Sequence, residues 1–163
     1  MNQINPLLGR SAPALTPIRA GGATGRVGSF GPTRKNSDGS PHQHNGTDLL
    51  AMIGWPVFAA HKGLVTVAGW ENDANPLQGY GRRVKIEATE EGRIRTVYAH
   101  LSLITVKPMD FVLPGSLIGL AGRSGNVGTD DAIPTHLHFE VHRGDGPGTW
   151  TPIDPELWIM GAL

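Results

Sequence analysis

The chain has 163 residues, which is enough for one domain with a sizeable core. Its 14 basic and 14 acidic residues balance, and no basic block occurs, which argues against a nucleic-acid partner. Cysteine is absent, so disulfides, thiolate metal sites and cysteine nucleophiles are excluded. A bound metal would need His, Asp or Glu ligands. No apolar run is long enough to span a membrane.

The N-terminal residues 1–24 predict an extended arm that precedes a single domain over residues 25–163. The arm contains three prolines and a glycine pair and shows no sustained periodicity. It also lacks the continuous apolar core of a signal peptide. We expect the arm to be loose or draped over the domain, in preference to acting as a pro-segment or a delivery tag.

The rest of the chain is typical of short strands joined by tight turns, because it is rich in glycine and proline. Residues 25–40 look irregular, with a turn at 30–31. The predicted strands are 56–60, 63–70, 83–88, 93–100, 117–121 and 137–143, with a turn at 90–92 that closes a hairpin. Helical periodicity occurs only near 155–160. These signals predict a mainly β fold, an antiparallel sheet or sandwich with a groove lined by loops and little helix.

The last predicted strand carries two histidines that alternate with apolar residues. Side chains alternate between the two faces of a strand, so Leu137, Phe139 and Val141 can enter a core. His136 and His138 then share the opposite face, where they could serve as metal ligands or as a ligand beside a base. A polar strand face that carries histidine by chance is the alternative.

A second segment places a histidine four residues before a carboxylate. Gly46 between His44 and Asp48 favours a turn that leads into a strand and lets both side chains converge on one ion. A catalytic zinc takes three protein ligands plus water, so a third ligand is needed, and His136 or His138 can supply it. An exposed turn with a chance pair is the alternative.

A third segment, a predicted strand, ends with His100. Strand parity places it on the face of Tyr98 and opposite Val97 and Leu101. A histidine in this position is usually structural, but here it is a candidate second base because other histidines need a catalytic partner. Tyr98 is open to two interpretations, lining the site or packing in the core.

These three segments, in this order, resemble the zinc metallopeptidases of the M23 family, the lysostaphin-like peptidoglycan endopeptidases. The family reads H-x-x-x-D, then a segment like Y-A-H-L, then H-x-H in a segment like H-L-H-F-E. Flanking features also match, namely Phe30-Gly31 with Arg34, and Gly79-Tyr80-Gly81. The resemblance covers about residues 28–145.

The resemblance implies one Zn²⁺ per chain, held by His44, Asp48 and His138, and catalytic roles for His100 and His136. It also implies a fold similar to a duplicated hybrid motif. The residues alone agree on the number and type of ligands, but they leave open which histidine of the H-x-H pair binds the metal.

The resemblance further implies a zinc-dependent endopeptidase that hydrolyses peptidoglycan stem peptides or cross-bridges. The sequence does not decide between a D-Ala–diaminopimelate link and a glycine-rich bridge, and we expect specificity to lie in the loops 72–81 and 128–134. The alternative function is a catalytically silent wall-binding activator of another hydrolase. A phosphoryl carrier is a further class, but such carriers lack this set of motifs.

Peptidoglycan lies outside the cytoplasmic membrane, so we expect the protein to act in the periplasm or the extracellular wall. Without a classical signal peptide, we expect delivery by a secretion machine or a phage, as an antibacterial effector or a lytic enzyme. An effector would need a cognate immunity protein. We expect a monomer.

The remaining polar residues receive structural interpretations. His61 is placed in a tight turn and His142 at the end of the histidine face, while His42 is weighed as an alternative ligand. Glu140 shares the histidine face and could orient a ligand from behind.

Overall fold

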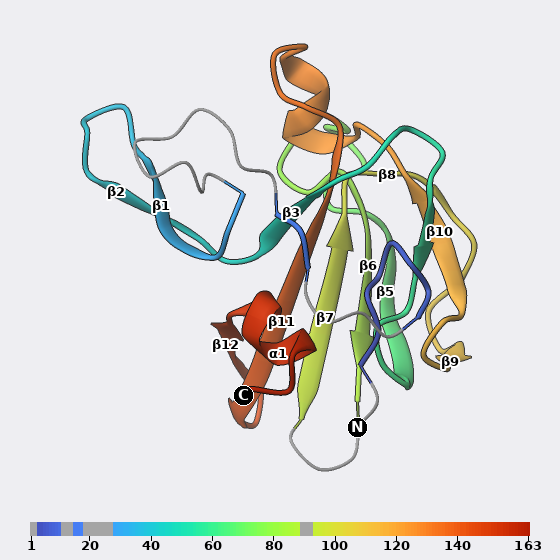
Figure 1. Cartoon of the computed structure of the whole chain (residues 1–163). Helices are drawn as coiled ribbons and strands as arrows, with labels where there is room; N and C mark the ends of the chain where they lie inside the picture. Colours follow the sequence, from blue (N-terminus) through green and yellow to red (C-terminus); the bar gives the residue numbers. More distant parts are fainter. Residues whose placement is uncertain (1–2, 11–14, 18–27, 89–92) are drawn as a thin grey trace.

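The computed structural model describes residues 3–10, 15–17, 28–88 and 93–163. Strands dominate these residues, as the sequence predicts, and they are antiparallel (Figure 1). The elements in chain order are β1 (Gly31–Lys35), β2 (Pro41–His44), β3 (Thr47–Leu50), β4 (Pro56–Phe58), β5 (Gly63–Trp70), β6 (Arg82–Glu87), β7 (Ile94–Ala99), β8 (Leu101–Ile104), β9 (Phe111–Val112), β10 (Leu117–Ala121), the 3₁₀ turn η1 (Gly125–Thr129), β11 (His136–Gly146), β12 (Thr149–Ile153) and α1 (Pro155–Ile159).

The main sheet has the strand order β12-β11-β7-β6-β5-β9. On one edge of the long strand β11, β3 pairs with its first residues and β12 pairs with its last. Strands β6 and β7 form the predicted hairpin, whose predicted turn at 90–92 lies outside the described residues. Figure 1 shows β11 and β7 side by side through the middle of the molecule.

A smaller sheet, in the order β4-β10-β8, shares one core with the main sheet. From β11, Leu137, Phe139 and Val141 point into this core and are fully buried. This confirms the predicted alternation of the histidine strand. Helix α1 covers the same side of β11, and its Trp158 belongs to the core.

The chain passes from the main sheet to the smaller one at a single residue, His100. Strand β7 ends at Ala99 and β8 begins at Leu101, and the residue between them has a φ of +62°. This left-handed conformation is unfavourable for a side chain with a Cβ. The corner therefore gives His100 a direction that a continuous strand would not.

Strands β1 and β2 form a separate two-stranded hairpin that projects from the main sheet, at the left of Figure 1. The expectation that residues 25–40 are irregular is thus wrong for 31–35. The hairpin has mostly exposed or half-exposed side chains, so it shows no alternation of apolar residues. Residues 25–27 lie outside the described part.

Two described segments of the N-terminal arm lie against the domain. The Ile4 N–H donates to the Ala60 carbonyl over 2.9 Å, and the Phe58 N–H donates to the Pro6 carbonyl over 2.8 Å. Leu15 is buried in the core, and Pro17 forms a bridge with Leu49 of β3. The predicted boundary between residues 24 and 25 falls among undescribed residues and stays a prediction.

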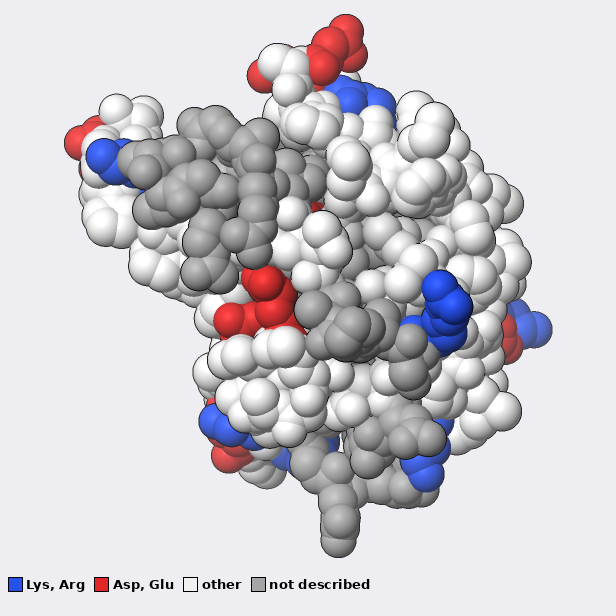
Figure 2. All heavy atoms as spheres, viewed as in Figure 1, with Lys and Arg blue, Asp and Glu red and all other residues white. Residues whose placement is uncertain are grey.

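Figure 2 shows that the described residues on the face viewed are mostly uncharged, with acidic and basic side chains in small separate groups. This agrees with the balanced charge of the sequence. No helix among the described residues is long and apolar enough to cross a membrane.

Candidate active site

Pairing between strands brings two of the predicted ligands together. His138 on β11 lies directly opposite Asp48 on β3 and, on its other side, opposite Ala99 of β7. Directly opposed residues in an antiparallel pair have Cβ atoms about 5 Å apart. The backbone register therefore places the carboxylate beside the imidazole.

The third predicted ligand, His44, arrives through a glycine turn. Asn45 and Gly46 join β2 to β3, as the sequence predicts. A Cβ on Gly46 would lie 2.6 Å from the Phe139 carbonyl oxygen and 2.9 Å from a ring carbon of His138. Only glycine lets the turn pass this close to β11, and this close passage carries His44 to the ligand cluster.

Three donor atoms converge in this cluster. Nδ1 of His138 lies 3.2 Å from Nε2 of His44 and 2.8 Å from Oδ1 of Asp48, and those two atoms are 3.3 Å apart. These three residues are buried and could hold one metal ion. In a tetrahedral site with bonds of about 2.0–2.1 Å, neighbouring donors are about 3.3 Å apart. Two imidazoles and a carboxylate with this spacing fit zinc.

Hydrogen bonds fix the orientation of the two ligand rings. Nδ1–H of His44 donates to the Ser29 carbonyl over 2.9 Å, which leaves the Nε2 lone pair facing the cluster. Nε2–H of His138 donates to Oε1 of Glu140 over 2.9 Å, so Nδ1 faces the cluster. Glu140 thus orients a ligand from behind, as its position on the histidine face indicates.

The electrostatics of the cluster are those of a cation site. Burial alone would raise the pKa of Asp48, but the hydrogen bond from His138, together with the neighbouring His44, holds it well below its ordinary value. Burial alone would lower the pKa of His138, but hydrogen bonds to Asp48 and Glu140 raise it to about 9. In the metal-free protein His138 is therefore an imidazolium at neutral pH, and an ion that binds Nδ1 must displace its proton.

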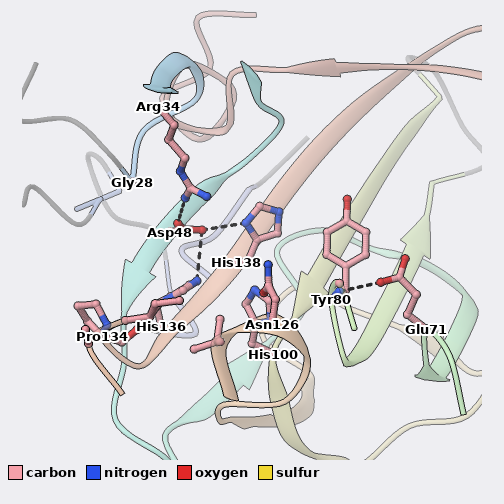
Figure 3. Close-up of a pocket in the computed structure, with 14 residues that line it drawn as sticks. Gly28, Arg34, Asp48, Glu71, Tyr80, His100, Asn126, Pro134, His136 and His138 are labelled. Atoms are coloured by element: carbon pink, nitrogen blue, oxygen red, sulfur yellow. Dashed lines mark hydrogen bonds and ion pairs between the residues drawn. The ribbon is translucent and has the colours of Figure 1, made fainter. Parts of the chain in front are cut away.

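Two further histidines, His100 and His136, stand beside the ligands (Figure 3). Nδ1–H of His136 donates to the Pro134 carbonyl over 2.8 Å, and Nδ1–H of His100 donates to the Ser124 carbonyl over 2.9 Å. Their ring centroids are 5.0 Å apart. Both rings thus keep an Nε2 lone pair, and Nε2 of His136 lies 3.5 Å from Oδ1 of the Asp48 carboxylate.

Both of these imidazoles are neutral. Burial, reinforced by the neighbouring His136 and His138, lowers the pKa of His100 to about 3. Burial also lowers the pKa of His136. At neutral pH either ring can accept a proton at Nε2.

The parity prediction for His100 is wrong. It places His100 on the same face as Tyr98, but Tyr98 is fully buried in the core, whereas His100 lines the cavity with His136 and His138. The left-handed backbone of His100 breaks the alternation, because parity holds only within a continuous strand.

Of the two interpretations of Tyr98, packing is correct. Its ring contacts Phe139 with centroids 5.3 Å apart, and its hydroxyl accepts the Ala60 N–H over 2.8 Å. Burial raises its pKa to about 12. The tyrosine that lines the site is Tyr80, whose hydroxyl donates to Oε1 of Glu140 over 2.7 Å.

The sequence predicts no site role for Tyr80 or Arg34, which match the family only as residues that flank the motifs. The Arg34 guanidinium forms an ion pair with Oδ2 of Asp48, and its Nη2 lies 3.2 Å from Nε2 of His44. Arg34 lies between Thr33 and Lys35 in a strand that shows no apolar alternation, so the local sequence carries no periodic signal. The resemblance of the flanking segments to the M23 pattern is therefore the signal in the sequence that points to these two residues.

The other histidines lie outside the ligand cluster. His42, weighed as an alternative ligand, is exposed and donates from Nδ1 to Oδ1 of Asn36 over 2.9 Å. His142 continues the histidine face and donates from Nε2 to Oε2 of Glu140 over 2.7 Å. His61 follows β4 and is fully buried.

A cavity of about 520 Å³ is lined by His100, His136, His138 and Asp48. One wall comes from the segment 71–80 and the other from the segment 126–134, which match the loops expected to form the rim. The described arm residues 3–10 and 15–17 do not belong to the lining.

Hydrogen bonds join the two rim loops. The Gly125 N–H donates to the Pro76 carbonyl over 3.0 Å, and the Asn126 N–H donates to the Gly79 carbonyl over 3.0 Å. The Ser124 hydroxyl accepts the Arg82 N–H over 2.9 Å. The loop segment that orients His100 is thus fixed to the opposite rim.

The profile of Peptidase family M23 matches residues 42–155, which include all five site residues. The chain belongs to peptidase family M23. Among curated relatives, the L-Ala–D-Glu endopeptidase of Bacillus subtilis (strain 168) is 32% identical over 116 residues. That match covers 69% of this chain and 33% of the relative, so the chain spans about a third of the relative's length.

Two solved structures share the fold. The catalytic domain of the antimicrobial peptidase lysostaphin from Staphylococcus simulans superposes with a TM-score of 0.64 at 30% identity, over 80% of this chain and 88% of that chain. A zinc-containing peptidase from Vibrio cholerae superposes with a TM-score of 0.60 at 32% identity, over 81% of this chain and 34% of that chain. The predicted lysostaphin-like fold is thereby confirmed.

Proposed function

We propose that this chain is a zinc-dependent endopeptidase that hydrolyses peptide bonds of peptidoglycan. The observation that carries the proposal is the convergence of His44, Asp48 and His138 on one point, with two neutral imidazoles beside them. Membership of the M23 family, and the similarity to a relative named for cleavage of an L-Ala–D-Glu bond, support the choice of substrate.

The roles of the five residues divide between binding and proton transfer. When zinc is bound, it polarises a carbonyl oxygen and lowers the pKa of water toward neutrality. His44, Asp48 and His138 would hold the ion. His100 and His136 keep their Nε2 lone pairs free of protein donors within the described residues, so one of them accepts the proton of the attacking water.

The ring that has accepted this proton completes the reaction. After one ring has accepted the proton at Nε2, an imidazolium stands next to the reacting carbon, where it stabilises negative charge or returns the proton to the leaving amine. Both rings lie beside the ligands with an Nε2 lone pair, so we assign these roles to the pair and not to one ring.

The proposed bond lies in the stem peptide or in the cross-bridge. The floor of the cavity is polar, whereas Val127, Ile133 and Pro134 make one wall apolar. An elongated peptide with small side chains fits such a groove, and both a D-Ala–diaminopimelate link and a glycine-rich bridge meet this description.

The alternative is a wall-binding activator without activity. Loss of a ligand or of a catalytic imidazole would favour it, and here all five side chains are present and oriented. We therefore favour the active enzyme.

Alanine variants separate binding from catalysis. We expect His44→Ala and His138→Ala to lose zinc and activity together, because each removes a ligand. His136→Ala and His100→Ala should keep stoichiometric zinc and lose turnover by at least 100-fold, in line with general acid–base catalysis. Zinc is measured by elemental analysis, and activity by mass spectrometry of fragments released from purified Gram-negative and Gram-positive walls.

His42→Ala is the matched control, since His42 is an exposed histidine two residues from a ligand. It should retain both zinc and activity. Zinc loss in His136→Ala would exchange the roles within the H-x-H pair. Undiminished cleavage in excess chelator would exclude the metal mechanism.

We further propose that the protein acts outside the cytoplasmic membrane, where peptidoglycan lies. Delivery by a secretion machine or a phage, a cognate immunity protein and a monomeric state are part of this proposal. Expression directed to the periplasm should lyse cells, whereas cytoplasmic expression should not. Equal toxicity in both compartments would contradict the proposed site of action.

A further inference from the structure

Arg34 reaches the metal centre from outside the main sheet. It lies on β1 of the projecting hairpin, and its guanidinium points at Asp48 (Figure 3). The Arg34 side chain is 34% exposed and that of Asp48 is 7% exposed, so the arginine occupies the solvent side of the carboxylate.

The two oxygens of Asp48 have different surroundings. Oδ1 lies 2.8 Å from Nδ1 of His138, 3.3 Å from Nε2 of His44 and 3.5 Å from Nε2 of His136. Oδ2 is engaged by the guanidinium of Arg34. Only Oδ1 therefore faces the point on which the ligand atoms converge.

We propose that Arg34 is a positioning residue that holds Oδ2 of Asp48, so that the carboxylate binds the metal through Oδ1 alone. A carboxylate can bind a metal through one oxygen or through two. If Asp48 supplied both, it would take up the coordination place that a catalytic zinc keeps open for water. Arg34 thus keeps one position of the metal accessible.

Arginine suits this task because of its chemistry. The guanidinium stays charged at every physiological pH and presents only donors, so it binds the carboxylate and cannot bind the ion. Lysine would offer a single ammonium on a flexible stem in place of a planar group. The contact also ties the hairpin, which carries His44 at its end, to the strand that carries Asp48.

One feature of the geometry offers a rival role. Nη2 of Arg34 lies 3.2 Å from Nε2 of His44, which is itself a ligand atom. If this contact dominated, the guanidinium would compete with the ion for His44, and its removal would strengthen metal binding. The two roles predict opposite changes in affinity.

The test compares the full-length protein with Arg34→Met, Arg34→Lys and the control Lys35→Met. Lys35 is the next residue of β1, exposed and on the other face of the strand. Zinc affinity is measured by competition with a chelator, and the coordination number by visible absorption of the cobalt-substituted protein. Neither readout uses turnover, so the outcome is independent of whether the chain cleaves peptidoglycan.

We expect Arg34→Met to lower zinc affinity by roughly 10- to 100-fold, as loss of a residue that orients a ligand typically does. Its cobalt spectrum should change from intense four-coordinate bands to weaker bands of higher coordination number. The zinc affinity of Arg34→Lys should fall between those of Arg34→Met and the unaltered protein. Lys35→Met should match the unaltered protein in affinity and in cobalt spectrum. Circular dichroism in chelator establishes that each variant is folded.

An unchanged affinity and spectrum in Arg34→Met would overturn the proposal, and tighter zinc binding would establish the competing role instead. If Arg34→Met does not fold, Arg34→Lys decides. A cobalt spectrum and zinc affinity identical to those of the unaltered protein would then show that planar binding of Oδ2 is not needed.

Discussion

Each of the seven histidines donates one ring N–H to an oxygen of the protein. Four of these histidines lie in the site, and their acceptors are carbonyl or carboxylate oxygens, which can only accept. These acceptors determine which ring nitrogen faces the cavity. A lone pair directed inward therefore follows from the backbone and from Glu140. The proton-transfer chemistry of each imidazole therefore depends on the acceptor that holds its other ring nitrogen.

Glu140 connects this orientation to a tyrosine. Its Oε1 accepts both Nε2–H of His138 and the hydroxyl of Tyr80. We expect Tyr80→Phe to lower zinc affinity several-fold, because Glu140 then holds the ligand ring with one partner fewer. Chelator competition measures the change.

Tyr98→Phe is the matched control for this prediction. It removes a phenol oxygen that contacts the Ala60 N–H, away from Glu140. This variant should lose stability, since it leaves a buried donor unpaired, at a cost of about 1–3 kcal/mol. Its zinc affinity should not change. An equal loss of affinity in both variants would contradict the role of Tyr80.

His61 predicts a pH dependence of stability. It is fully buried, donates from Nδ1 to the Lys62 carbonyl over 2.7 Å, and its Nε2 lies 3.0 Å from the Thr96 hydroxyl. Burial lowers its pKa in the folded protein below the model-peptide value of 6.5. Its contribution to stability is therefore complete above about pH 6.5 and is lost as the pH falls from there toward the folded pKa.

The variant His61→Gln isolates this contribution. Glutamine keeps a donor and an acceptor but does not titrate. We expect its melting temperature to fall less between pH 7.5 and 5.5 than that of the unaltered protein, with both measured in excess chelator. Parallel decreases in the two proteins would assign the pH dependence to other groups.

At the scale of elements, the sequence predicted what depends on local pattern. Strands 63–70 and 117–121 are found as predicted, and the strands predicted at 83–88 and 93–100 are found within one residue at each end. Their alternation reflects one buried and one polar face. The helix near 155–160 is observed as Pro155–Ile159, with Asp154 as its N-cap.

The elements that were missed lack such a pattern. Strands β1 and β2 are mostly exposed, and β9 has only two residues, so none of these three strands gives a periodic signal. Strand β3 follows the turn at Gly46 as expected, but its pairing with β11, which is distant in sequence, was not predictable from local pattern. Long-range pairing and the corner at His100 are properties of the folded chain.

The joined rim loops predict that Gly125, near the site, cannot be exchanged. Gly125 has a φ of +74°, and a Cβ there would lie 2.3 Å from the Gly79 carbonyl oxygen. We expect Gly125→Ala to separate the loops and to move Ser124, the acceptor for His100. Overpacking of this kind typically costs about 1–3 kcal/mol in unfolding free energy.

Gly39→Ala provides the control, because Gly39 also has a positive φ, +83°, but has no atom within 4 Å of an added Cβ. It should show backbone strain alone and retain activity. Urea unfolding and wall digestion measure both effects. Equal behaviour of the two variants would mean that the contact between the loops does not matter.

At the scale of the molecule, the metal ligands could be predicted from the sequence more completely than the fold that surrounds them. His44, Asp48 and His138 form a cluster as the resemblance implied. The positions of Arg34 and Tyr80 required the structure, since they arrive from a hairpin and a loop whose placement is set by tertiary contacts. The ligand motifs and Glu140 are encoded locally, whereas the contacts of Arg34 and Tyr80 with them are not.

The separate hairpin leads to a last prediction, about zinc supply. One ligand, His44, ends β2 of the two-stranded hairpin, while Asp48 and His138 belong to the main sheet. An isolated two-stranded hairpin is at best marginally stable. We expect chelation to speed amide hydrogen exchange in residues 31–44 while β6 and β7 stay protected, as read by mass spectrometry. Unaltered protection of the hairpin would contradict this.

If so, zinc scarcity would act on this protein twice. A molecule that had lost its ion would be inactive and would also present a loosened ribbon of backbone to proteases in its surroundings. Metal-starved copies would then be degraded first, and the population that survives in a zinc-poor environment would be enriched in competent enzyme.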